Sequence, residues 1–144
     1  MNKSNLTPKQ IQQLIDTATE ALQSAYAPYS GFRVGAAVLT STGKMYAGCN
    51  MENASYGLSM CAERNAIANA LIGEGKDTIE IKAIAVTNNK KVSCSPCGAC
   101  RQVIQEFGRE AEVIFRGISP SQNKPQAKWQ CSTIEELLPV GFSL

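Results

Sequence analysis

Apolar residues recur along the first part of the chain at the spacing of an α-helix. Thr7 and Pro8 precede them and form a typical helix start, because a threonine hydroxyl caps the first N–H groups and proline fits the first turn. We therefore expect an amphipathic helix over residues 8–25. The Pro and Gly of "APYSGF" (27–32) end it. Its apolar face carries Ile11, Leu14, Ile15, Ala18 and Leu22.

Short apolar runs rich in strand-forming residues predict the strands. The runs 33–40 ("RVGAAVLT") and 44–50 ("KMYAGCN") are separated by "STG", so they form an antiparallel hairpin. Three further runs predict strands at 81–88, 111–117 and 128–132.

Helical segments lie between and after these strands. Ser59 is expected to cap a helix over 60–75, which ends at Gly73 or Gly75. The segment "SPCGACRQVIQEFG" opens with Ser-Pro and closes with Gly, which indicates another helix, and "TIEELLP" predicts a short last one. Strands that alternate with helices imply crossover connections and a partly parallel sheet covered by helices. The leading hairpin makes that sheet mixed.

Composition narrows the class of protein. The 144 residues carry a formal net charge of +2, contain no dense Lys/Arg run and fit a single domain over 1–144. Neither nucleic acid nor a membrane surface is expected as a partner. The first residues lack the apolar segment of a signal peptide, and no apolar run approaches the roughly 20 residues that span a bilayer. We expect a cytoplasmic protein whose thiols stay reduced.

The candidate chemistry lies in the cysteines. The chain has six cysteines and no histidine, which excludes Ser–His and Cys–His nucleophiles and every histidine-ligated metal. The pair Cys97-x-x-Cys100 is compatible with a redox dithiol at a helix start. With Cys94 it forms C-x2-C-x2-C, but no cysteine follows at the spacing of an iron–sulfur site. A structural zinc would need a fourth thiolate, and the sequence has no second, separate Cys-x-x-Cys pair elsewhere to supply it.

A catalytic zinc needs only three protein ligands and leaves one position for water. Cys61 is the candidate third ligand, because Cys61 and Cys97 both fall in first turns of predicted helices, where thiolates are favoured. Glu63 is too close to Cys61 along the helix to be a comfortable co-ligand, yet it is near enough to reach a water. Arg64 follows Cys61 by three residues, so it lies on the same face and offsets the negative charge of the thiolates. A surface ion pair of Glu63 and Arg64 is the alternative interpretation.

These residues carry a resemblance to a known family. "CAER", followed about 34 residues later by "SPCGACRQVI", resembles the zinc deaminase signature C-x-E…P-C-x-x-C. "PYSGFRVGAAVLT", "GCNMENASYG" and "ELLPVGFS" extend the similarity to the short-chain cytidine deaminases over residues 8–142. The resemblance implies a three-layer α/β/α sandwich with a five-stranded mixed sheet.

The same resemblance implies a role for each matching residue. Zinc, one per subunit, is held by Cys61, Cys97 and Cys100. Glu63 moves protons between the attacking water, N3 of cytosine and the departing ammonia, and Arg64 supports the ligand sulfurs. The implied substrate-binding residues are Phe32, near the base, Asn50 and Glu52, at the ribose hydroxyls, Ala62, and Tyr56 and Phe142, at sites that neighbouring subunits of a homotetramer complete.

We therefore expect zinc-dependent deamination of cytidine and 2′-deoxycytidine in pyrimidine salvage. The alternatives are a deaminase of blasticidin S or of N4-modified cytidines, and a non-enzymatic structural zinc module. The sequence departs from the family in a long polar insert, residues 118–130, which we expect to alter the rim of the site. Cys94 stands where an apolar residue is expected, and Asn65 where threonine is usual.

Overall fold

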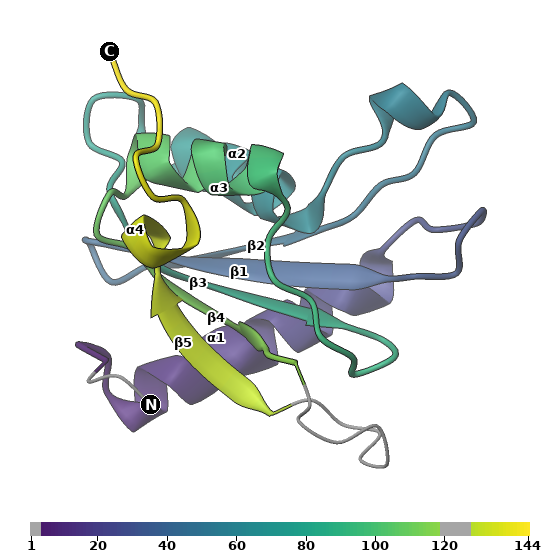
Figure 1. Ribbon diagram of the computed structural model, residues 1–144, viewed down its shortest axis with the longest axis horizontal. Coiled ribbons are helices and arrows are strands. Elements are labelled where there is room, and N and C mark those ends of the chain that lie inside the picture. The colour runs from purple at the N-terminus through teal and green to yellow at the C-terminus, as the bar shows by residue number, and fades with distance from the viewer. Residues whose placement is uncertain (1–3, 119–127) are drawn as a thin grey trace.

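Five strands form one mixed sheet in the computed structural model, which describes residues 4–118 and 128–144 (Figure 1). The strands are β1 (Val34–Thr40), β2 (Met45–Cys49), β3 (Ile81–Asn88), β4 (Glu112–Arg116) and β5 (Trp129–Thr133). The helices are α1 (Pro8–Ala21), α2 (Ala62–Glu74), α3 (Gly98–Phe107) and α4 (Ile134–Leu137), with 3₁₀ turns η1 (Leu22–Ser24) and η2 (Tyr56–Leu58).

The strand order is β2-β1-β3-β4-β5. The β1–β2 hairpin is antiparallel as expected, and β1 also pairs antiparallel with β3. Strands β3 and β4 are parallel and are connected through α3, while β5 returns antiparallel to β4. The expected five-stranded mixed sheet is confirmed.

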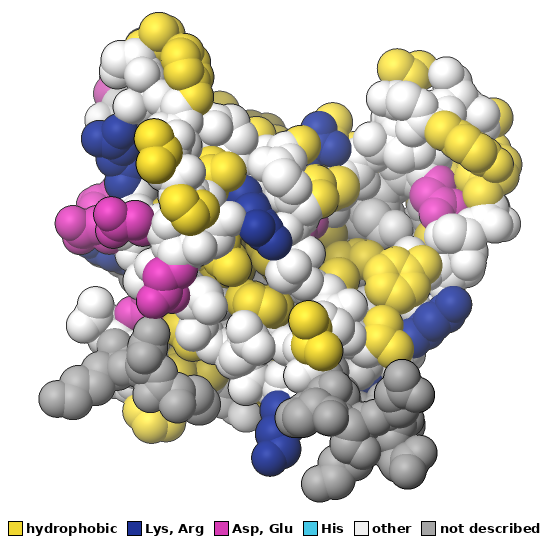
Figure 2. All heavy atoms as spheres, in the orientation of Figure 1, with side chains coloured by type: hydrophobic (Ala, Val, Ile, Leu, Met, Phe, Trp, Pro, Cys, Tyr) yellow, Lys and Arg dark blue, Asp and Glu magenta, His cyan; other side chains and the backbone are white. Residues whose placement is uncertain are grey.

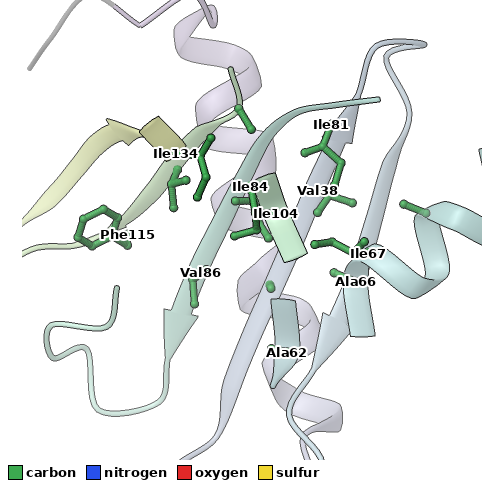
Figure 3. Packing of buried hydrophobic residues seen from close by; sticks show 14 residues of the cluster. Val38, Ala62, Ala66, Ile67, Ile81, Ile84, Val86, Ile104, Phe115 and Ile134 are labelled. Carbon is green, nitrogen blue, oxygen red and sulfur yellow. The ribbon is translucent and has the colours of Figure 1, made fainter. Parts of the chain in front are cut away.

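The sheet is covered on both faces, because the strands alternate their apolar side chains between two cores. Ala37 and Leu39 of β1 pack with Leu14 and Ala18 of α1 on one face. Val38 of β1 packs on the other face with a cluster from β3, α2, α3 and α4. Figure 3 shows its members Val38, Ile67, Ile84, Ile104 and Ile134. The three-layer arrangement therefore places α2 and α3 side by side over one face of the sheet (Figure 1).

Two of the expected helix starts are wrong by a few residues. Ser59 is not the cap of α2, because Met60 and Met51 exchange backbone hydrogen bonds of 2.9 and 3.0 Å and keep the chain extended. The cap is Cys61. In the same way α3 begins after Cys97 and not at Ser-Pro. Cys61 and Cys97 are therefore the capping residues of α2 and α3 and do not lie within their first turns.

The predicted start of α1 is confirmed, since Thr7 caps the helix and forms a capping box with Gln10. It ends earlier than expected, since the α-helix stops at Ala21 and continues as the 3₁₀ turn η1. The greater part of the polar insert, 119–127, lies outside the described residues. No helix in residues 4–118 or 128–144 is long and apolar enough to cross a lipid bilayer.

Gly48 sets the distance between α2 and the edge of the sheet. A Cβ atom at this position would lie 2.2 Å from the backbone N of Ala66 and 2.5 Å from the carbonyl O of Ala62. The helix therefore approaches β2 more closely than a side chain would permit, and its N-terminus is fixed over the end of the hairpin.

Candidate active site

Helices α2 and α3 begin beside each other, and a cysteine stands at each start. Cys61 caps α2 and Cys97 caps α3, both in extended conformation and neither with a side-chain capping hydrogen bond. Cys100 lies in the first turn of α3 and is fully buried. The positive ends of two helix dipoles therefore favour negative charge on this group of sulfurs.

The three sulfur atoms lie close enough to share one ion. Sγ of Cys61 is 4.0 Å from Sγ of Cys97, and all three sulfurs lie within 4.8 Å of one another. Tetrahedral thiolate ligands at 2.3 Å from zinc would be about 3.8 Å apart, so a small contraction brings these atoms to ligand distance. Three sulfur donors without histidine suit zinc, and the group fits the metal that the sequence predicted.

Arg64 and the neighbouring thiols lower the cost of negative charge on Cys61. Nη2 of Arg64 donates a hydrogen bond to Sγ of Cys61 at 3.7 Å. Hydrogen bonds from the Cys100 thiol and from Arg64 lower the pKa of Cys61 to about 5. The pKa of Cys100 is raised, because this thiol retains the proton that it shares with Cys61. These contacts therefore favour the thiolate form of Cys61.

Glu63, in the first turn of α2, lines a cavity together with Cys61 and Cys97. Its side chain is only 5% exposed, and burial raises its pKa to about 7, with a further contribution from the negative charge of Cys61. A carboxyl group with such a pKa can both accept and return a proton near neutral pH. The alternative of a surface ion pair is wrong, because Glu63 is buried and Arg64 contacts the cysteine sulfur.

A cavity of about 510 Å³ opens beside Cys61 and Cys97, which is large enough for a small organic ligand. Figure 2 shows a hollow between the body of the molecule and the arm formed by residues 51–60, whose tip carries hydrophobic side chains. Among the described residues that line this cavity, Glu52 and Glu63 are the only Asp, Glu, Lys or Arg residues. The lining consists of Tyr29, Ser30, Val34, Asn50, Met51, Glu52, Asn53, Tyr56, Ser59, Met60, Cys61, Ala62, Glu63, Cys94, Ser95 and Cys97.

Asn50 and Glu52 line the cavity and also hold its wall together. The amide of Asn50 accepts a hydrogen bond from the N–H of Val34 at 2.8 Å and donates to the carbonyl of Phe32 at 2.9 Å. The carboxylate of Glu52 accepts hydrogen bonds from Tyr29 N, at 2.8 Å, and from the Ser30 hydroxyl. The two side chains therefore fix the 29–34 segment against the loop that follows β2.

The three aromatic residues expected near the substrate lie in different surroundings. Tyr56 lines the cavity, is 76% exposed and contacts the ring of Tyr29 edge to face, with 6.0 Å between centroids. Phe32 and Phe142 are not among the residues that line it. The ring of Phe32 lies 5.8 Å from Nζ of Lys90, and Phe142 is 69% exposed in the C-terminal segment. Only Tyr56 is thus brought to the cavity of its own chain.

Several cavity residues were missed in the sequence. Tyr29 and Ser30 belong to the loop "APYSGF", for which the sequence singled out only Phe32 as a candidate, although Glu52 binds both of them. Cys94 lines the cavity and also packs against the core, and burial raises the pKa of its thiol to about 11. The sequence signal for a place at the cavity is that Cys94 lies three residues before Cys97, in the loop that leads to this candidate ligand.

The chain was compared with known proteins. The family model described as "Cytidine and deoxycytidylate deaminase zinc-binding region" matches residues 8–116. A cytidine deaminase of Halalkalibacterium halodurans is 42% identical over 132 residues, covering 92% of this chain and 93% of the relative. A blasticidin-S deaminase of Bacillus cereus is 28% identical over 148 residues and 99% of both chains.

Solved structures give the same result. The crystal structure of cytidine deaminase from Burkholderia pseudomallei superposes with a TM-score of 0.79 at 42% identity, covering 95% of this chain and all of the other.

Proposed function

The chain belongs to the cytidine and deoxycytidylate deaminase family, and we propose that it converts cytidine and 2′-deoxycytidine to uridine and 2′-deoxyuridine with release of ammonia. The observation that carries this function is the meeting of three thiols and a buried carboxyl group at the starts of two adjacent helices. A purely structural zinc site has no use for the buried Glu63.

Cys61, Cys97 and Cys100 would hold the zinc ion, and zinc supplies a Lewis acid that lowers the pKa of a water molecule. Arg64 offsets part of the charge of three thiolates, because it already donates to Sγ of Cys61. Without this cation the thiolates would weaken the acidifying effect of the metal.

Glu63 is the group that moves protons. It takes a proton from the water whose oxygen bonds to C4 of the cytosine ring, and it delivers this proton to N3. It then transfers the second proton of the water to N4 as the C4–N4 bond breaks and ammonia leaves. The raised pKa of Glu63 suits both directions of transfer near neutral pH.

Asn50 and Glu52 are proposed to bind the ribose hydroxyl groups. Both are at the cavity wall, and each retains hydrogen-bonding capacity beyond its contacts with the 29–34 segment. Ala62, fully buried at the cavity wall, would contact the base. Phe32, whose carbonyl accepts a hydrogen bond from Asn50, is proposed to lie near the base.

The charge of the cavity favours a nucleoside over a nucleotide. No Lys or Arg is among the described residues that line it, and its two carboxyl groups would repel a 5′-phosphate. Cytidine 5′-monophosphate is therefore expected to be a far poorer substrate than cytidine.

The active sites are proposed to be completed in a homotetramer. Phe142 is exposed and away from the cavity of its own chain, and Tyr56 is exposed at its rim, so both are available to a neighbouring subunit. We place this assembly in the cytoplasm, in pyrimidine nucleoside salvage, with the nucleoside as its partner and with neither nucleic acid nor membrane involved.

The test is ammonia release from cytidine, measured with and without prolonged zinc chelation and compared with cytidine 5′-monophosphate, cytosine and blasticidin S. Rapid, chelator-sensitive release from cytidine supports the proposal. Preferential turnover of blasticidin S would assign that substrate instead. If free cytosine reacts as fast as cytidine, the sugar-binding role of Asn50 and Glu52 is wrong. A metal-free protein with a reversible Cys97–Cys100 disulfide would indicate a dithiol oxidoreductase.

A further inference from the structure

Arg101 connects two parts of the chain that lie far apart in sequence. It is in the first turn of α3, directly after Cys100, and its guanidinium group makes three hydrogen bonds. Nε donates to the carbonyl of Pro96 at 2.8 Å, Nη2 to the hydroxyl of Ser95 at 3.2 Å, and Nη1 to the carbonyl of Leu137 at 2.7 Å.

The first two hydrogen bonds hold the loop that presents Cys97. Pro96 is fully buried, and Ser95 and Cys97 both line the cavity. At the other end of this loop, the N–H of Cys94 donates to the carbonyl of Arg116 in β4 at 3.0 Å. The loop is thus held by the sheet at Cys94 and by Arg101 at Ser95 and Pro96.

The third hydrogen bond holds the beginning of the C-terminal segment. Leu137 is the last residue of α4, and its carbonyl belongs to the group that a helix leaves without an internal partner. The segment that follows passes beside α3 (Figure 1), where Gln102 and Gln105 donate to the carbonyl of Phe142 at 2.9 and 3.0 Å. Arg109 donates to the hydroxyl of Ser143 at 2.7 Å.

We propose that Arg101 is a positioning residue that fixes the Cys97 loop and the C-terminal segment as one unit. This rests on the proposed function, in which Cys97 holds zinc in its own site and Phe142 serves the site of a neighbouring subunit. One guanidinium group then sets a metal ligand in one active site and a substrate contact in another. A planar fork with several donors is needed, since a lysine ammonium cannot reach three acceptors in this arrangement.

The chain offers a matched control. Arg101 contacts both the loop and the segment, whereas the Arg109 side chain donates a hydrogen bond to Ser143 of the segment. Arg101→Lys and Arg109→Lys both replace a guanidinium group with an ammonium group and leave the net charge unchanged. Comparing them separates the effect of holding the Cys97 loop from the effect of holding the C-terminal segment alone.

The experiment measures zinc release to a colorimetric chelator, together with kcat and KM for cytidine. We expect Arg101→Lys to release zinc about 10- to 100-fold faster than wild type and to change both kcat and KM. Arg109→Lys should release zinc at the wild-type rate. The visible spectrum of the cobalt-substituted protein should shift in Arg101→Lys and not in Arg109→Lys, because thiolate–cobalt bands report the geometry of Cys97.

Wild-type zinc release and an unchanged cobalt spectrum in folded Arg101→Lys would overturn the proposal. Equal acceleration in both variants would also overturn it, because the segment alone would then hold the loop. If wild-type protein binds zinc but does not deaminate cytidine, the proposed function fails, while zinc release and the cobalt spectrum still decide the role of Arg101.

Discussion

Nη2 of Arg64 lies 3.7 Å from Sγ of Cys61, one helical turn farther along α2. The cation is therefore built into the same helix that presents the first metal ligand. Replacing it with a neutral group of similar shape changes the charge at the sulfurs while the helix is kept.

Arg64→Gln should retain zinc and lose about 10- to 100-fold in kcat, because the thiolates then donate more charge to the metal. Zinc content and the rate of absorbance loss for cytidine check this. Arg64→Lys is the control that keeps the positive charge but lacks the planar guanidinium group, and it should recover part of the lost rate. A full rate in Arg64→Gln would show that the charge on the sulfurs is unimportant.

Glu63→Gln should keep the fold and the zinc but lower kcat by about 10³- to 10⁴-fold, since the amide cannot move protons. The exposed Glu20 of α1 provides the comparison, and Glu20→Gln should behave as wild type. Retained deamination in Glu63→Gln would contradict the mechanism.

The cysteine assignments predict a clear division among variants. Cys61→Ser, Cys97→Ser and Cys100→Ser should each lose zinc, whereas Cys94→Ser should bind one zinc per chain. Burial raises the pKa of Cys94, which opposes the thiolate form that a ligand needs. Metal analysis of the four purified proteins decides, and a zinc-free Cys94→Ser would add this residue to the ligand set.

Buried Glu63 should make the stability of the metal-free protein depend on pH. Its pKa is about 7 in the folded chain and 4.5 ordinarily, so folding favours the protonated form. This contribution is present in full below pH 4.5 and is lost as the pH rises through 7, by about 3 kcal/mol in total. Cys61 acts in the opposite sense, because its lowered pKa gives stability that is lost as the pH falls through about 5.

Glu63→Gln separates these two contributions, because it keeps Cys61. Urea unfolding of both reduced, metal-free proteins should show that wild type loses stability relative to Glu63→Gln between pH 4.5 and 8. Parallel pH profiles would mean that the carboxyl group is solvated in the metal-free chain.

Shared active sites predict complementation between two defective subunits. Phe142→Ala subunits supply Glu63, and Glu63→Gln subunits supply Phe142, so random mixed tetramers should regain about a quarter of the competent sites. The control mixes Glu63→Gln with Cys97→Ser, whose missing groups belong to the same chain, and it should regain no activity. Equal behaviour of the two mixtures would place Phe142 outside the neighbouring site.

The sequence predicted the strands well because they follow local patterns, and its motifs singled out the three cysteines that the structure brings together. The run 81–88 coincides with β3, and "CAER" and "PCGAC" fall at the starts of α2 and α3. The start of α2 lies later than the sequence predicts. The chain before Cys61 is kept extended by the pairing of Met60 with Met51, a residue nine positions away that a local pattern does not reveal. Arg101 was missed for the same reason, since its partner Leu137 comes from a distant helix.

The starts of α2 and α3 have a consequence for the lifetime of the protein. Helices usually begin at a hydroxyl or carboxyl side chain that satisfies the first N–H groups, at a value of about 1 kcal/mol each. Here cysteines occupy both positions and make no such hydrogen bond. A zinc ion held by Cys61 and Cys97 would tie the two capping residues together in place of separate caps. We therefore expect loss of zinc to fray the starts of both helices at once and to make them more open to proteolysis.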